Sequence, residues 1–245
     1  MGFLTSLFYP WGLILQVIAL IHFFRRRPDT YWVFIIIFLG PLGALIYIVA
    51  EIIPDYQILN QSFKGFSRGK RIRDLQLIIR DNPAAGNYEE LGELYMESGD
   101  YLAARDAFDK AISGHIDTID TFYRRGVCSL RLGDASAAVA DIEPVVAKDP
   151  AYDFHRAGGL LAHAYALTGQ IEKSEALFRR VLIISTLSET YLNFASMLAA
   201  TGRTAEARQY AMKVLEKAPT MPRYLRRRER PWFQQAKKLL RQLPG

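Results

Sequence analysis

From about residue 70 onward, hydrophobic residues recur every three or four positions, in paired segments of about a dozen residues that are typical of amphipathic helices. Four glycines, Gly99, Gly133, Gly169 and Gly202, separate the two segments of each pair, and they lie 34, 36 and 33 residues apart. Glycine is favoured there because the chain leaves a helix most easily through a left-handed turn. The pattern therefore predicts helix–turn–helix units that stack as an array.

The residues around the glycines also follow a repeated order of small and large side chains. In the first unit this order comprises Leu91, Gly92, Tyr95, Gly99, Ala104, Phe108 and Ala111. It resembles the tetratricopeptide repeat (TPR), and the resemblance covers about residues 85–219. The fold that it implies is all-α: a TPR α-solenoid of about four repeats, at about 85–118, 119–152, 155–187 and 188–219, with capping helices.

Some positions depart from this pattern. Arg125 and Ser129 stand where the second unit should have large apolar residues, and Ser174 replaces a small apolar residue in the third unit. The third unit is also longer at its start, where residues 150–153 indicate a turn.

Apolar spacing predicts a leading half-repeat helix over 71–80 and a closing helix over 232–243, preceded by Pro231.

Residues 1–56 have a different composition. Residues 3–24 and 31–50 are free of charge, and about 20 apolar residues suffice to span a bilayer as a helix. We expect a transmembrane hairpin with helices at about 3–24 and 31–53, although Pro10 and Gly12 leave a re-entrant first segment as an alternative. Pro41 should kink the second helix. A cleaved signal peptide fits poorly, because no basic residue precedes the first run.

This segment resembles the N-terminal membrane hairpin of cardiolipin synthases and other phospholipase-D-related proteins. The shared features are the basic loop Arg25–Arg27, the apolar run led by Trp32, the Pro41-Leu42-Gly43 core and Tyr47. The resemblance ends there, because no histidine is followed by lysine two positions later, as the catalytic signature of those enzymes requires. The chain then divides into the hairpin (1–56), a basic juxtamembrane linker with the leading helix (57–80), the TPR array (81–219) and a basic segment with a capping helix (220–245).

Charge is unevenly distributed along the chain. The formal net charge is +6, yet residues 81–217 contain 20 acidic and 14 basic residues. The basic excess lies at the two edges of the array, at Lys64, Arg68, Lys70, Arg71, Arg73, Arg226, Arg227 and Arg228. These residues could contact anionic membrane lipids, an acidic partner or solvent; nucleic acid is disfavoured because no recognition motif accompanies them.

The same charges suggest a location. We expect a protein of the bacterial inner membrane, and if both apolar helices span, the positive-inside rule places the TPR array in the cytoplasm. If only the second spans, the array is exported. The single Cys128 fits either side, since it excludes only an internal disulfide.

Candidate chemistry is sparse. One cysteine and four histidines show no recognised zinc spacing, and no phosphate loop or nucleophile elbow is present. We therefore predict no enzymatic activity, no metal and no cofactor. What remains is the concave groove, which in TPR arrays is lined by the first helix of each unit. The resemblance assigns the groove to Glu89, Glu93, Glu97, Asp120, Tyr123, Val127, Arg131, Arg156, His163, Leu192 and Ser196.

These groove residues suggest a partner. Chaperone-tail clamps have Lys and Asn where this chain has Glu89 and Glu93, so an acidic tail is an unsuitable ligand. A peptide with basic residues at one end and apolar ones further along suits the groove better. The sequence thus indicates a membrane-anchored TPR scaffold or adaptor for a protein or peptide partner. The alternative is a non-catalytic accessory of phospholipid or envelope synthesis that contacts anionic lipid; neither indicates an oligomeric state.

Overall fold

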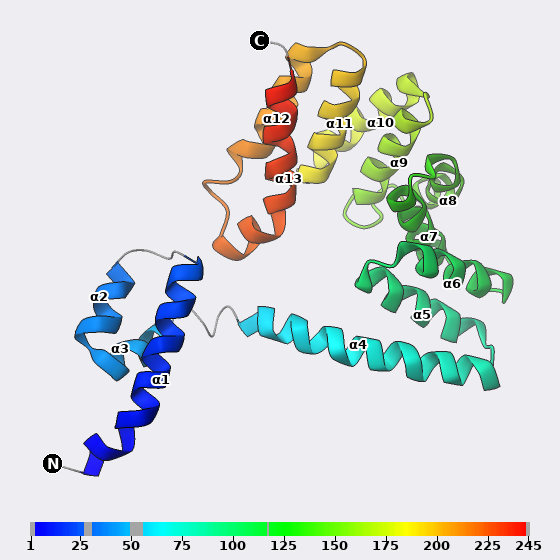
Figure 1. Cartoon of the computed structure of the whole chain (residues 1–245). Helices are drawn as coiled ribbons and strands as arrows, with labels where there is room; N and C mark the ends of the chain where they lie inside the picture. Colours follow the sequence, from blue (N-terminus) through cyan, green and yellow to red (C-terminus); the bar gives the residue numbers. More distant parts are fainter. Residues whose placement is uncertain (1–2, 27–30, 50–55, 117, 244–245) are drawn as a thin grey trace. The chain divides into compact units, whose positions relative to one another are not determined.

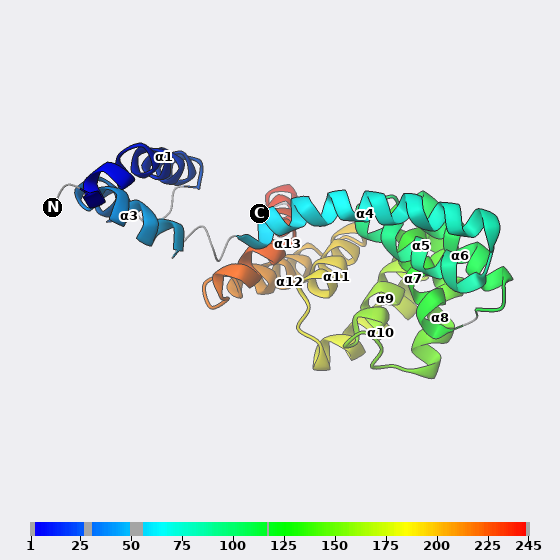
Figure 2. The ribbon, with the colours of Figure 1, turned by 90° about the horizontal axis from the view of Figure 1, so that it is seen from below.

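The computed structural model describes residues 3–26, 31–49, 56–116 and 118–243, and within these ranges it omits the side chains of residues 3–11, 25–26, 56–67 and 223. The described residues form 13 α-helices in two compact units, Met1–Arg71 and Ile72–Gly245. The first unit contains α1 (Phe3–Arg26), α2 (Tyr31–Phe38), α3 (Gly40–Tyr47) and most of α4 (Tyr56–Asp81). The second unit follows a curved path of helical hairpins (Figures 1 and 2).

Four hairpins make up most of the second unit, and each consists of two helices of 12 to 14 residues. They are α5 (Ala85–Ser98) with α6 (Tyr101–Ser113), α7 (Ile119–Leu132) with α8 (Ala135–Lys148), α9 (Arg156–Leu167) with α10 (Ile171–Ile184), and α11 (Ser188–Ala200) with α12 (Thr204–Glu216). The turn glycines at 99, 133, 169 and 202 have φ of +85°, +85°, +78° and +79°. The left-handed turns predicted at these four positions are therefore confirmed.

The stack curves toward the first helix of each hairpin. Helix α9 packs against both α7 and α11, whereas the second helices of neighbouring hairpins lie farther apart. The core between the hairpins contains large side chains such as Phe108, Ile142, Phe178 and Phe194, which are fully buried. Small residues admit these side chains: a Cβ on Gly92 would lie 2.7 Å from the Phe108 ring. The predicted alternation of small and large positions thus builds the core.

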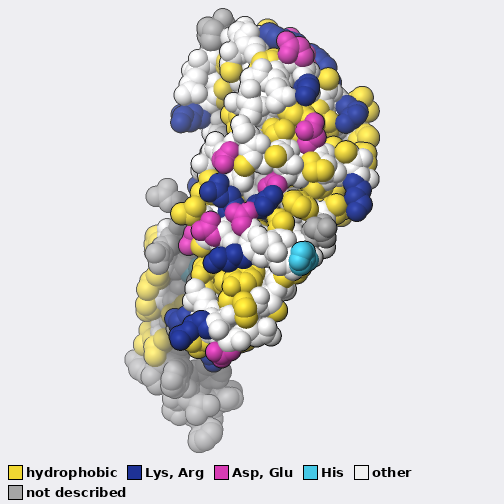
Figure 3. Space-filling model, turned by 90° about the vertical axis from the view of Figure 1, so that its right-hand side faces the viewer, with side chains coloured by type: hydrophobic (Ala, Val, Ile, Leu, Met, Phe, Trp, Pro, Cys, Tyr) yellow, Lys and Arg dark blue, Asp and Glu magenta, His cyan; other side chains and the backbone are white. Residues whose placement is uncertain are grey.

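Two of the three polar residues that depart from the repeat pattern, Arg125 and Ser174, have partners inside the array, whereas the buried Ser129 hydroxyl has no hydrogen-bond partner among the described residues. Arg125 donates two hydrogen bonds to Asp141, which is 5% exposed, and pairs with Asp109 at 2.7 Å. The buried Ser174 hydroxyl donates to the Ala162 carbonyl at 2.7 Å. Ion pairs also join hairpins, as between Arg203 and Glu175 at 2.7 Å. Figure 3 shows a face on which acidic and basic side chains lie next to each other.

Both ends of the array are covered by helices longer than the sequence indicates. Leu75 of α4 is buried against Leu91 and Ala107. At the other end α13 (Arg223–Gln242) continues through Pro231, which the sequence places before the helix. The apolar face of α13 explains this continuation, because Phe233 and Ala236 are buried in one cluster with Leu192 and Val214. The burial of these side chains offsets the loss of one helical hydrogen bond, since proline has no backbone N–H to donate.

The prediction of a transmembrane hairpin is not supported. Among the described residues, no helix combines the length and the apolarity that crossing a bilayer requires. The second apolar run breaks at Leu39 into α2 and α3, each of eight residues, and Gly40 has a φ of +59°. Eight residues of helix extend only about 12 Å, against about 30 Å of hydrocarbon. The predicted inner-membrane location is therefore wrong, and Pro41 stands at the start of a new helix instead of at a kink.

The first unit contains its own small apolar cluster. Ala19 of α1 is buried with Trp32 and Ile36 of α2 and with Ala44 and Tyr47 of α3. Gly43 allows α3 to approach α2 very closely, because a Cβ there would lie 2.0 Å from the Ile35 carbonyl oxygen. The residues that resemble a membrane hairpin thus pack against one another.

One prediction concerns the helix cap of α6. Asp100 is the N-cap residue, and its side chain accepts a hydrogen bond from the Ala103 amide at 3.1 Å. We expect Asp100→Ala to lower the free energy of unfolding by about 1 kcal/mol, because an amide at the helix start loses its acceptor. Asp100→Asn keeps an acceptor and should cost much less in urea denaturation. Equal losses in the two variants would show that charge, and not capping, is responsible.

Candidate functional site

The first helices of the hairpins bring most of the predicted groove residues to one side of the array. We define the concave groove as Glu89, Glu93, Glu97, Asp120, Tyr123, Arg131, Arg156, His163, Glu189 and Ser196, together with the pocket residues named below. Two predicted members lie deeper: Val127 is 4% exposed, and Leu192 is 3% exposed and is covered by α13. A role for these residues in binding a partner stays a prediction.

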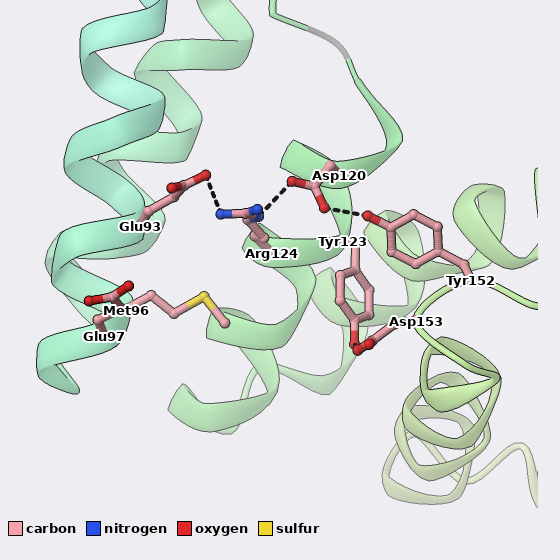
Figure 4. A pocket seen from close by; sticks show the side chains of 8 residues that line it. All are labelled: Glu93, Met96, Glu97, Asp120, Tyr123, Arg124, Tyr152 and Asp153. Atoms are coloured by element: carbon pink, nitrogen blue, oxygen red, sulfur yellow. Dashed lines mark hydrogen bonds and ion pairs between the residues drawn. The ribbon is translucent and has the colours of Figure 1, made fainter. Parts of the chain in front are cut away.

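A pocket of about 550 Å³ opens at the start of the groove. We call it the groove pocket, and it is lined by Glu93, Met96, Glu97, Asp120, Tyr123, Arg124, Tyr152 and Asp153 (Figure 4). Helix α5 contributes the first three residues, α7 the next three, and the turn between α8 and α9 the last two. Since its walls come from two consecutive hairpins and the turn that follows them, the pocket exists only when these hairpins are stacked.

Hydrogen bonds and ion pairs link the walls of the groove pocket. Arg124 places its Nε 2.7 Å from Asp120 Oδ2, and its other end pairs with Glu93 of α5. The Tyr152 hydroxyl donates to Asp120, and the Tyr123 hydroxyl donates to Asp153 (Figure 4). Each contact joins residues about one repeat apart or one helical turn apart. Contacts between neighbouring hairpins, and with the turn after α8, therefore hold the pocket in shape.

The turn that carries Tyr152 and Asp153 has an unusual backbone. Asp153, Phe154 and His155 have φ of +49°, +52° and +66°, so three consecutive non-glycine residues are left-handed. Each such residue costs roughly 1–2 kcal/mol. The turn projects Phe154 into solvent with 87% exposure, while the Asp153 carboxylate faces Tyr123 and Arg156. The strained backbone thus places a carboxylate in the pocket and an aromatic ring outside it.

Beyond the groove pocket, the groove continues as a second charged cluster. Arg156 of α9 places its Nε 2.7 Å from Glu189 of α11, and it also reaches Tyr123 at 3.3 Å. Arg131 lies 3.7 Å from the same glutamate. Between the first and second hairpins, the Thr121 hydroxyl of α7 donates to Glu89 of α5 at 2.6 Å. These contacts tie the inner helices together along the groove.

Burial shifts the pKa values of three groove residues, Tyr123, Tyr152 and His163. Burial raises the pKa of Tyr123 and that of Tyr152, with further increases from Asp153 and Asp120 respectively, so both hydroxyls stay protonated donors. Burial lowers the pKa of His163, against the attraction of nearby Glu189, so its imidazole is neutral at pH 7. Besides these neutral side chains, the lining of the groove pocket contains four carboxylates and one guanidinium group. That balance favours positively charged ligands.

Four pocket residues were missed by the sequence analysis: Met96, Arg124, Tyr152 and Asp153. Two of them precede or follow predicted groove positions on the same helix, where a small rotation of the helix decides which side chain faces inward. The other two lie on the turn at 150–155. The extra length of the third unit was the available signal, since an insertion between hairpins has to project from the stack.

The predicted lipid-facing basic residues lie on α4 and α13. On α4, Lys70, Arg71 and Arg73 are exposed and Arg68 is partly buried, while the side chain of Lys64 lies outside the described residues. On α13, Arg226, Arg227 and Arg228 are exposed, and Arg226 also donates to the Pro219 and Met221 carbonyls. The structure offers no support for lipid as their partner.

In the part of the chain that the structure describes, few residues are candidates for metal binding or thiol chemistry. In that part, no group of three or more His, Cys, Asp or Glu side chains could hold a metal ion. Cys128 is fully buried, and burial raises the pKa of its thiol to about 11. A thiol of this kind is a poor nucleophile at neutral pH.

Comparisons with known proteins agree with this architecture. Family models described as tetratricopeptide repeat match residues 85–113 and 187–218. Mouse DnaJ homolog subfamily C member 3 is 30% identical over 93 residues, which are 38% of this chain but only 18% of that relative. Neither the family models nor this relative supports the resemblance to cardiolipin synthases.

Solved structures show the same fold at low sequence identity. MamA from Desulfovibrio magneticus RS-1 gives a TM-score of 0.57 at 23% identity, covering 67% of this chain and 93% of that one. YrrB, described as a TPR protein with an unusual peptide-binding site, gives 0.55 at 18% identity, covering 68% and 86%. TPR proteins are in general non-catalytic scaffolds. The second unit of this chain is an all-α solenoid built of tetratricopeptide repeats.

Proposed function

We propose that this chain is a non-catalytic scaffold that binds a protein or peptide partner in the concave groove. The observation that carries the proposal is the groove pocket, which is open, has aromatic walls and contains more carboxylates than cations. YrrB supports it as a structural neighbour with a peptide-binding site. A partner segment would place a positively charged side chain in the pocket and apolar side chains along Met96 and Phe154.

We do not propose the alternative role in phospholipid or envelope synthesis. It rested on a membrane hairpin, and no described helix meets the requirements for crossing a bilayer. Recognition by groove-lining helices needs no such anchor.

A binding experiment tests the proposal with the full chain. The probes are a fluorescein-labelled peptide, Arg-Lys-Arg-Ala-Leu-Phe-Leu, and its counterpart with Glu at the three basic positions, followed by fluorescence anisotropy. We expect the basic peptide to bind and Asp120→Asn to weaken it about 3–10-fold, because a pocket carboxylate is lost. Binding should also weaken as salt is raised.

Asp134→Asn is the matched control. Asp134 has a side-chain exposure of 46%, close to the 42% of Asp120, but it caps α8 outside the pocket, and Asn preserves that cap. The control variant should bind the basic peptide like the unmodified chain. Equal binding of the acidic and basic peptides, or equal losses in the two variants, would refute the proposal.

A further inference from the structure

The groove pocket already holds a guanidinium group, which belongs to the chain itself. Arg124 lies between Asp120 of its own helix and Glu93 of the preceding hairpin (Figure 4). These two carboxylates are thus spaced to accept one planar, forked donor. A guanidinium group satisfies two carboxylates at once through N–H groups in a fixed plane, whereas an ammonium group acts as a point charge. The spacing favours arginine over lysine.

Two of the four carboxylates of the pocket, Asp120 and Asp153, have supports other than Arg124. The Tyr152 hydroxyl donates to Asp120, and the Tyr123 hydroxyl donates to Asp153. The two tyrosine rings lie 5.0 Å apart with an interplanar angle of 69°, so each ring braces the other. Asp120 and Asp153 would therefore keep their positions if Arg124 left. Asp120, one of the two acceptors of Arg124, is thus pre-organised, which lowers the cost of binding a cation.

The two ion pairs of Arg124 are partly exposed to solvent. Its side chain is 31% exposed, and those of Glu93 and Asp120 are each 42% exposed. Ion pairs at this exposure contribute little to stability, because water screens them and a long side chain loses freedom to form them. A second guanidinium group brought by a bound partner can therefore replace Arg124 at small cost.

Resting on the proposed function, we propose that the groove pocket selects an arginine side chain of the partner and that Arg124 occupies this arginine subsite until the partner displaces it. Met96 and the two tyrosine rings line the walls, where they can cover the methylene stem and the guanidinium plane of the incoming side chain. Arg124 then acts as an internal competitor of the ligand.

The test uses small probes and the full chain. N-acetyl-arginine N-methylamide, its lysine counterpart and its neutral citrulline counterpart are titrated while the methyl NMR signal of Met96 is followed, with Met96→Leu for assignment. We expect the arginine probe to bind at least about threefold more tightly than the lysine probe, and citrulline to cause no shift. Arg124→Gln should tighten arginine binding about fivefold, because the competitor is gone.

Arg105→Gln is the matched control for Arg124→Gln. The Arg105 side chain is 29% exposed and pairs with Asp134 at 3.5 Å, outside the groove pocket. This variant makes the same change in net charge and should leave arginine binding unchanged. Glu93→Gln should weaken the arginine probe more than the lysine probe, which provides a second readout if Arg124→Gln folds poorly.

The outcomes separate this inference from the proposed function. Equal affinity for the arginine and lysine probes at Met96 would overturn the arginine selectivity and leave peptide binding intact. Weaker arginine binding by Arg124→Gln, with circular dichroism unchanged, would overturn displacement and make Arg124 a support of the pocket. If neither these probes nor the basic peptide bound in the groove, the proposed function itself would be lost.

Discussion

Phe178→Ala should lower the free energy of unfolding of the array by about 3–5 kcal/mol, the largest effect expected of any single substitution considered for this chain. Phe178 of α10 is fully buried, and its ring lies 5.1 Å from that of Phe194 of α11. Phe194 in turn lies 4.7 Å from Tyr210 of α12. The truncation removes a ring at the joint between two hairpins, and the remaining side chains cannot fill the space.

The measurement is urea denaturation followed by circular dichroism, with Phe154→Ala as the matched control. Phe154 is 87% exposed, so the same chemical change there should alter stability by less than about 0.5 kcal/mol. A broadened transition in Phe178→Ala would indicate that the third and fourth hairpins unfold before the others. A loss below about 1 kcal/mol would contradict the packing of these two hairpins through Phe178.

Asp141→Ala should destabilise the array by about 2–3 kcal/mol, because it leaves a partly buried guanidinium group without its main partner. Arg125 donates to both carboxylate oxygens of Asp141, at 2.9 and 2.5 Å. The expected loss lies below that of a fully buried pair, since the Arg125 side chain is 23% exposed and keeps Asp109.

Two further variants identify the cause of that loss. Asp109→Ala removes a carboxylate with 50% side-chain exposure from the same arginine and should cost less than about 1 kcal/mol. Combining Asp141→Ala with Arg125→Met removes both charges, and this double variant should recover part of the stability. If the double variant is no more stable than Asp141→Ala, the unpaired guanidinium group is not the source of the loss.

Much of the fold could be predicted because the signals were local. Each turn glycine ends a helix through its own φ angle, and the small residues near it determine how closely two helices approach. Arg125 and Ser174 looked like defects in the repeat. Their partners, Asp141 and the Ala162 carbonyl, lie 16 and 12 residues away in sequence, on the neighbouring helix of the same hairpin. Only the packed hairpin reveals them.

A helix was expected over about residues 3–24 and α1 occurs there, but the second apolar segment was predicted incorrectly for a related reason. Apolar composition indicates one long helix here, but the helix ends at Leu39, and a second helix, α3, packs against α2. Gly43 permits that close return, since a side chain there would collide with the Ile35 carbonyl. Hydrophobicity measures how well a segment avoids water and carries no information about whether its helix is continuous.

The candidate site was only partly accessible from the sequence. The resemblance gave Glu93, Glu97, Asp120 and Tyr123, which line the groove pocket, since repeat positions map onto helix faces. It could not give Tyr152 and Asp153, because they lie on a turn whose three left-handed residues follow no repeat rule. Turns of this kind depend on the contacts that stabilise them, which come from other units.

The contacts that line the groove have a consequence for folding and evolution. Glu89 with Thr121, Asp120 with Tyr152, Tyr123 with Asp153 and Arg156 with Glu189 are separated by 32, 32, 30 and 33 residues. Among the groove contacts described above, only that of Arg131 with Glu189 skips a hairpin. The average sequence separation of contacts therefore stays low, which favours rapid, stepwise folding from any starting hairpin. Duplicating one hairpin would keep the existing contacts between adjacent hairpins and add one new junction, so an ancestor could have lengthened its ligand-binding surface in steps of one hairpin.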